Sequence, residues 1–67
     1  MKNFIRLLCM DRETIIAVDT ISYIDREDTQ LFIRYKNDDI IRSYKFHSSH
    51  EAFIAFEQIW KEVNNND

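Results

Sequence analysis

The stretch TQLFIRYKNDDIIRSYKF, residues 29–46, decides the fold of this chain. Apolar and polar residues alternate in two runs, 29–36 and 40–46, which is the pattern of half-buried β-strands. The intervening triplet NDD at 37–39 predicts the turn, because Asn and Asp tolerate the left-handed backbone conformation that glycine would usually supply. The stretch therefore predicts an antiparallel hairpin.

The two faces of this hairpin can be assigned before the turn length is known. The parity of pairing is the same for a shorter or a longer even-numbered loop, so the residues that share a face do not change. We expect the core face to carry Leu31, Ile33, Tyr35, Ile40, Arg42, Tyr44 and Phe46. The outer face is then made of Phe32, Arg34, Lys36, Ile41, Ser43 and Lys45.

Glycine and proline are both absent from the 67 residues. Asp and Asn are then the main turn-forming residues, so further reversals are expected at the acidic clusters 11–13 and 25–28. The absence of glycine also excludes a phosphate-binding loop and a dinucleotide-binding fingerprint, because both require residues without a Cβ atom.

The segments before the hairpin also have strand character. Residues 4–10 are almost wholly apolar, and residues 14–18 are a β-branched run. An interruption at 19–20 separates this run from a second apolar stretch at 21–24. The interruption is either a β-bulge within one strand or a short crossing segment that separates two strands.

A helix follows the hairpin, and the sequence SSHE at 48–51 marks its start. This fits a capping box, in which Ser48 and Glu51 satisfy two backbone donors reciprocally. The arc expected to pack on the sheet consists of Ala52, Phe53, Ala55, Phe56, Ile59, Trp60 and Val63. Ile54 alone points the other way, toward solvent or a partner.

Short links between all these elements favour antiparallel strands, because parallel strands need long crossover connections. The predicted fold is α+β: an antiparallel meander of four strands, or five if the interruption separates two, with one C-terminal helix packed on one face. Residues 1–63 are expected to form this single small domain, and residues 64–67 a disordered tail.

Length and cysteine content suggest where the chain works. A core of this size supplies only about 3–5 kcal/mol, so a homodimer or another protein partner is expected. The single Cys9 can form no internal disulfide, which is typical of a reducing compartment. No apolar run reaches the ~18 residues of a membrane span. We therefore predict a cytoplasmic protein with no membrane partner.

Serines and histidines cluster at the predicted helix start. His47, Ser49 and His50 adjoin the capping pair, but neighbours at a helix start radiate outward and form neither a pocket nor an oxyanion hole. Two histidines without a second pair elsewhere do not make a tetrahedral metal site. We predict no enzymatic activity, no metal and no cofactor.

The outer face of the predicted sheet is more apolar than a solvated face usually is, and Phe4, Leu8 and Met10 add to it. The candidate partner-binding residues are Phe32, Arg34, Lys36, Ile41, Lys45 and Ile54. A solvated face, a protein interface and a single-stranded nucleic-acid site all fit this set, the last because cations surround an aromatic ring. The net charge of −3 argues mildly against nucleic acid.

The stretch 15–63 resembles two small bacterial families. The V-x2-I-x2-I spacing within 18–24, the alternating strands around a turn at 37–38 and the Ser-capped helix are similar to the flagellar FlbD-like proteins. The segment DTISYI at 19–24 is similar to LytTR-type DNA-binding domains. The chain lacks the turn glycine of the first family and the basic recognition surface of the second, so no functional residue is carried over.

The predicted function is that of a small non-enzymatic protein-binding module that acts through an exposed sheet face. A glycine-free chain rich in Ile, Asn, Asp, Lys and Phe suits an AT-rich bacterial or phage genome, where such proteins often regulate or inhibit larger machines. The alternative is a single-stranded nucleic-acid-binding protein that uses the basic and aromatic outer face of the hairpin.

Overall fold

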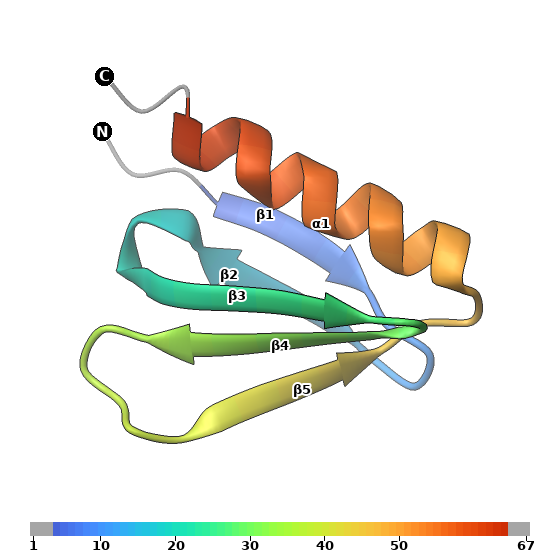
Figure 1. The fold of residues 1–67 in the computed structure, drawn as a ribbon, viewed down its shortest axis with the longest axis horizontal. Coiled ribbons are helices and arrows are strands. Elements are labelled where there is room, and N and C mark those ends of the chain that lie inside the picture. Colours follow the sequence, from blue (N-terminus) through green and yellow to red (C-terminus); the bar gives the residue numbers. More distant parts are fainter. Residues whose placement is uncertain (1–3, 65–67) are drawn as a thin grey trace.

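The computed structural model describes residues 4–64, which fold into an α+β domain of antiparallel strands with one C-terminal helix (Figure 1). The strands are β1 (Phe4–Leu8), β2 (Glu13–Ala17), β3 (Ile21–Glu27), β4 (Gln30–Tyr35) and β5 (Ile41–Lys45). A 3-10 turn, η1 (Val18–Thr20), joins β2 to β3, and the helix is α1 (Ser49–Asn64). The predicted class is confirmed.

The strands form two sheets rather than one meander. β1 pairs with β2 in a two-stranded sheet, and β3, β4 and β5 form a three-stranded sheet in that order. The chain passes between the sheets at η1, where the Thr20 hydroxyl donates to the Ala17 carbonyl at 2.7 Å. The interruption at 19–20 is thus a crossing segment, so the single four-stranded meander is wrong and the five-strand reading is nearer.

The hairpin of β4 and β5 has the predicted pairing. Leu31 lies opposite Tyr44, and Ile33 lies opposite Arg42, so the assignment of faces by parity is confirmed. The core face is shorter than predicted, however, because β5 begins at Ile41 and both Ile40 and Arg42 are exposed at the tip of the hairpin.

The turns use different chemistry from the one predicted. Among residues 4–64 the positive φ of a residue other than glycine occurs at Asp28, with φ of 56°, between β3 and β4. At 37–39 the Asp38 carboxylate instead accepts from the Ile40 N–H at 3.0 Å and from the Arg42 guanidinium at 3.0 Å. The left-handed turn at 37–39 is therefore wrong. The reversal predicted at 25–28 is confirmed only at its end, because 25–27 belong to β3 and the chain turns at Asp28 and Thr29.

The core lies between the inner faces of the two sheets and α1. Its buried side chains are Ile5, Leu7, Ile16, Val18, Leu31, Ile33, Tyr44, Phe46, Ala52, Ala55 and Ile59. The hydroxyls of Tyr35 and Tyr44 lie 3.0 Å apart at the edge of this core. Burial and this hydrogen bond raise the pKa of Tyr35 well above its usual range.

Helix α1 begins as predicted but buries a narrower stripe. The Glu51 N–H donates to the Ser48 hydroxyl at 3.2 Å, which is the first half of the predicted capping box. Phe53, Trp60 and Val63 are exposed, because a single helix on a small sheet covers the core with only about a 100° stripe. Helix α1 includes Asn64, and the rest of the predicted tail lies outside the described residues.

Within residues 4–64, no helix combines the length and the apolar character needed to cross a membrane.

Candidate protein interface

The outer face of the three-stranded sheet brings together four of the six predicted partner-binding residues. We call it the β3–β5 outer face; it consists of Tyr23, Asp25, Glu27, Gln30, Phe32, Arg34, Ile41, Ser43 and Lys45. Arg34 lies between Tyr23 of β3 and Ile41 of β5, and Phe32 lies between Asp25 and Ser43.

The two remaining candidates lie elsewhere. Lys36 follows the end of β4, where its N–H donates to the Thr20 carbonyl at 2.7 Å, beyond the ladder of β4 and β5. Ile54 is on α1, which packs on the inner side of the sheets. The six residues therefore do not form one surface.

Acidic side chains interrupt the cations of the β3–β5 outer face. Asp25 and Glu27 on β3 share this face with Arg34 and Lys45. The Tyr23 hydroxyl donates to Asp25 Oδ2 at 3.3 Å, and the charge of that carboxylate is the main reason that the pKa of Tyr23 is raised. Phe32 is only partly exposed. The face is of mixed charge rather than cationic.

The outer face of the two-stranded sheet is more apolar. We call it the β1–β2 outer face; its cross-strand partners are Phe4 and Ala17, Arg6 and Ile15, and Leu8 and Glu13. Its large apolar side chains are 60% (Phe4), 56% (Leu8) and 67% (Ile15) exposed. Among residues 4–64, the one ion pair on this face joins Arg6 to Glu13 at 3.5 Å; it is exposed and contributes about 0–1 kcal/mol.

Sequence reasoning found two of these three apolar residues. Phe4 and Leu8 were expected to add to an exposed face, whereas Ile15 was missed because it stands beside Ile16 in a β-branched run that hides the alternation. A register built outward from the turn of β1 and β2 would have found it, since the Cys9 N–H donates to the Arg12 carbonyl at 2.9 Å and so places Ile15 opposite Arg6.

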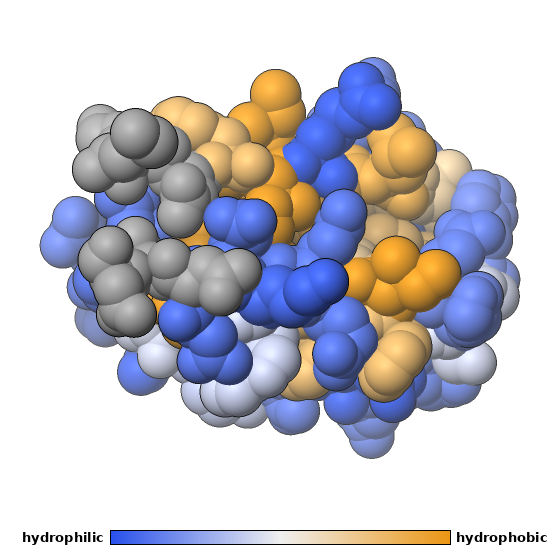
Figure 2. All heavy atoms as spheres, turned by 90° about the horizontal axis from the view of Figure 1, so that it is seen from above, coloured by the Kyte–Doolittle hydropathy of each residue, from blue (hydrophilic) through white to orange (hydrophobic). Residues whose placement is uncertain are grey.

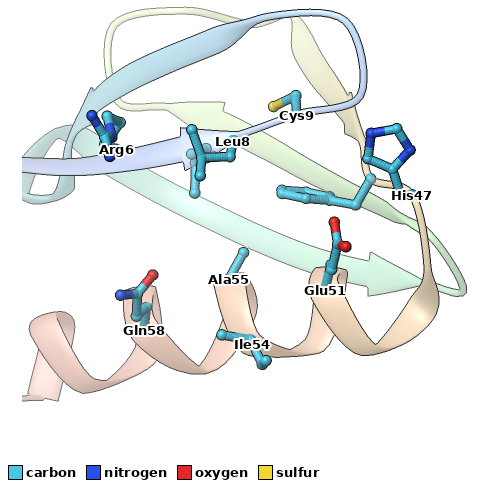
Figure 3. A pocket seen from close by; sticks show the side chains of 10 residues that line it. Arg6, Leu8, Cys9, His47, Glu51, Ile54, Ala55 and Gln58 are labelled. Atoms are coloured by element: carbon cyan, nitrogen blue, oxygen red, sulfur yellow. The ribbon is translucent and has the colours of Figure 1, made fainter.

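A groove runs between β1 and α1, with a volume of about 430 Å³ (Figure 3). We call it the β1–α1 groove; its lining is Arg6, Leu7, Leu8, Cys9, Phe46, His47, Glu51, Ile54, Ala55 and Gln58. A second hollow of about 470 Å³ extends it toward Phe4 and Glu62 and shares Arg6, Leu8 and Gln58 with the first. Ile54, the outlying residue of the predicted helix, is thus part of this groove.

The groove combines apolar and polar side chains: its two hollows share Arg6, Leu8 and Gln58, and Glu51 and Glu62 line its helical wall on either side of Gln58. In Figure 3, Leu8 on β1 lies across the groove from α1, where Ala55 points toward β1, and Glu51 lies at the end near His47. Burial raises the pKa of the Cys9 thiol, which lowers its reactivity at neutral pH. Viewed from the side that carries α1, hydrophobic surface emerges at several places between hydrophilic side chains (Figure 2).

Of the residues considered for chemistry, Ser48 has a structural role. The Ser48 hydroxyl accepts the bond from the Glu51 N–H, as the capping role requires. In the part of the chain that the structure describes, no group of three or more His, Cys, Asp or Glu side chains is placed to hold a metal ion.

Comparison with known proteins found no family model, no curated protein and no solved structure with significant similarity to this chain. The resemblance to FlbD-like and LytTR-type proteins stays a prediction from the sequence.

Proposed function

We propose that this chain is a small non-enzymatic protein-binding module that regulates or inhibits a larger bacterial or phage-related machine in the cytoplasm. The observation that carries the proposal is the β1–β2 outer face, where Phe4, Leu8 and Ile15 are all more than half exposed. Outward-facing positions of an antiparallel sheet are usually polar when that face meets water.

Burial of these side chains supplies a driving force for association. Complete burial of a Leu, Ile or Phe side chain is worth about 1.5–3 kcal/mol relative to full exposure. Exposed apolar side chains gathered on one face are typical of protein-interaction sites. The partner is either a second copy of the chain or a different protein.

Binding of single-stranded nucleic acid is the second candidate, favoured by Phe32 with Arg34 and Lys45 on the β3–β5 outer face. Asp25 and Glu27 on the same face would repel phosphates, which is why we rank it lower. It predicts an affinity for an oligo-dT strand that falls steeply with salt and drops on Phe32→Ala. Absence of binding at low salt would remove it.

The test of protein binding combines light scattering with a pull-down from the cells that naturally express the chain. Wild-type protein, Ile15→Lys and Ile40→Lys are compared; Ile40, at 62% exposed, is matched in exposure to Ile15 but lies at the tip of the β4–β5 hairpin. We expect wild type and Ile40→Lys to form the same dimer or retain the same protein, and Ile15→Lys to lose it. A wild-type monomer that retains nothing at high concentration would contradict the proposal.

A further inference from the structure

Among the strands of residues 4–64, none pairs with one of the two backbone edges of β1, the edge opposite β2. The bond from the Cys9 N–H to the Arg12 carbonyl sets the alternation of the ladder with β2. Hydrogen-bonded pairs recur every second residue in an antiparallel ladder, so the backbone N–H and C=O groups of Ile5 and Leu7 point toward β2. The N–H and C=O groups of Arg6 and Leu8 therefore point to the opposite edge.

The next residue of the same parity confirms this direction. The Met10 N–H donates to the Lys45 carbonyl at 2.8 Å, at the corner where β1 leaves its sheet and β5 ends. After this bond, the segment that follows β5 turns away into α1. Outside the β1–β2 ladder, the backbone groups of Arg6 and Leu8 form no backbone hydrogen bond with any residue of 4–64. Figure 3 shows that this edge of β1 faces the groove and α1.

The dimensions of the groove suit an extended segment of about the length of β1. Five residues of antiparallel strand span about 17 Å. On the opposite wall, Glu51 and Glu62 are separated by about 16 Å along the helix axis, at 1.5 Å per residue. An added strand of five or so residues would therefore run from one carboxylate to the other.

We propose that an extended segment of a partner protein adds to the free edge of β1 and fills the β1–α1 groove. This inference rests on the proposed function and names how the partner is held. Backbone hydrogen bonds to Arg6 and Leu8 fix the segment, and alternate apolar side chains pack against Leu8 and Ile54. Lys or Arg side chains near its ends lie opposite Glu51 and Glu62, because the helical wall carries these carboxylates.

A displayed library of random ten-residue peptides, selected on the full chain, tests the proposal. We expect the enriched peptides to alternate apolar and polar residues and to carry a basic residue toward each end. The double variant Glu51→Lys with Glu62→Lys should enrich acidic ends instead. Failure to enrich any peptide, or enrichment without alternation, would overturn the proposal.

Amide hydrogen exchange with the best peptide reads the backbone contact directly. The amides of Arg6 and Leu8 should gain protection, whereas those of Ile5 and Leu7 should not, since they already face β2. A peptide N-methylated on the residues that face β1 should bind at least a hundredfold more weakly, and a peptide methylated at the other parity should bind as before. Protection centred on the β3–β5 outer face would overturn the proposal.

Two variants separate this proposal from the proposed function. Ile54→Lys should weaken the selected peptide at least tenfold, and Ile40→Lys should not change its binding. If the natural partner no longer bound Ile15→Lys but still bound Ile54→Lys, the proposed protein-binding function would be retained. Binding of the partner in the β1–α1 groove would be overturned. If the amides of Arg6 and Leu8 became protected from exchange as the protein concentration rose, with no peptide present, a second copy of the chain would occupy the edge of β1. The proposal of a segment from a partner protein would then be overturned.

Discussion

The outer faces of the two sheets differ in how they meet solvent. On the β3–β5 outer face, charged residues of both signs surround Phe32, which is partly buried among them. On the β1–β2 outer face, Phe4, Leu8 and Ile15 are exposed beside the ion pair of Arg6 and Glu13. Both sheets contribute their inner faces to the same core, so the demands of folding do not explain the difference. The proposed function rests on the apolar one of these two faces.

Two neighbouring leucines of β1 give the largest test of this comparison. Leu7 is 1% exposed and Leu8 is 56% exposed. Leu7→Ala should lower the free energy of unfolding by about 2–5 kcal/mol, because it opens a cavity in the core. Leu8→Ala should change it by less than about 0.5 kcal/mol. Urea unfolding followed by circular dichroism measures both, and comparable losses would mean that the β1–β2 outer face serves stability rather than binding.

Charge placed on each outer face gives the next largest effect. Ile15→Lys should weaken the complex with the retained partner at least tenfold, which is about 1.4 kcal/mol, because it puts an ammonium into an apolar contact. Arg34→Glu, on the β3–β5 outer face, should change affinity less than threefold. Titration calorimetry with the purified partner measures both. The reverse order would move the interface to the β3–β5 outer face.

The turns of the three-stranded sheet provide a smaller effect on stability. Asp28 has a positive φ, which a β-branched residue adopts only at a cost, whereas Asp39 has no such backbone requirement. Asp28→Val should lower the free energy of unfolding by on the order of 1 kcal/mol. Asp39→Val should lower it by less than about 0.5 kcal/mol. Equal losses in urea unfolding would contradict the turn assignment.

Local patterns in the sequence were sufficient for the hairpin and the helix start. The alternation at 29–36 and 40–46 fixed which residues share a face, and Ser48 marked the helix start, because both features depend on neighbours in sequence. The division into two sheets depended on the path of the chain at 19–20, which a bulge and a crossing segment explain equally well. The turn chemistry was misplaced because Asp serves in two ways, by backbone conformation at Asp28 and by its side chain at Asp38.

The candidate site was only partly accessible from sequence for a similar reason. Phe32, Arg34, Ile41 and Lys45 share a face by parity within one hairpin, and this grouping was correct. Ile54 is predicted to face outward, but its place beside the groove that Leu8 also lines depends on how α1 crosses β1. The free edge of β1 is also a tertiary property, since it exists only because β5 leaves for the helix after one hydrogen bond between Lys45 and Met10.

The smallest predicted effect is a pH dependence confined to the three-stranded sheet. The bond from the Ile40 N–H, and then the Arg42 guanidinium, hold the pKa of the Asp38 carboxyl below its ordinary value. The folded state therefore binds this proton less readily than the unfolded state. The resulting stabilisation is complete above the unfolded pKa near 4 and is lost as the pH falls through the folded pKa.

Asp38→Asn isolates this contribution, because it keeps an oxygen acceptor for the Ile40 N–H and removes the charge that Arg42 binds. The difference in melting temperature between wild type and Asp38→Asn should shrink as the pH falls below about 4, where the wild-type carboxyl also becomes neutral. The Ile40 and Arg42 amide resonances should move with that titration, while those of Arg6 and Leu8 should not respond to the substitution. A shift of the Arg6 and Leu8 amide resonances with the titration of Asp38 would mean that the two sheets are electrostatically coupled. The contrast between their outer faces would then have to be explained by this coupling rather than by separate roles.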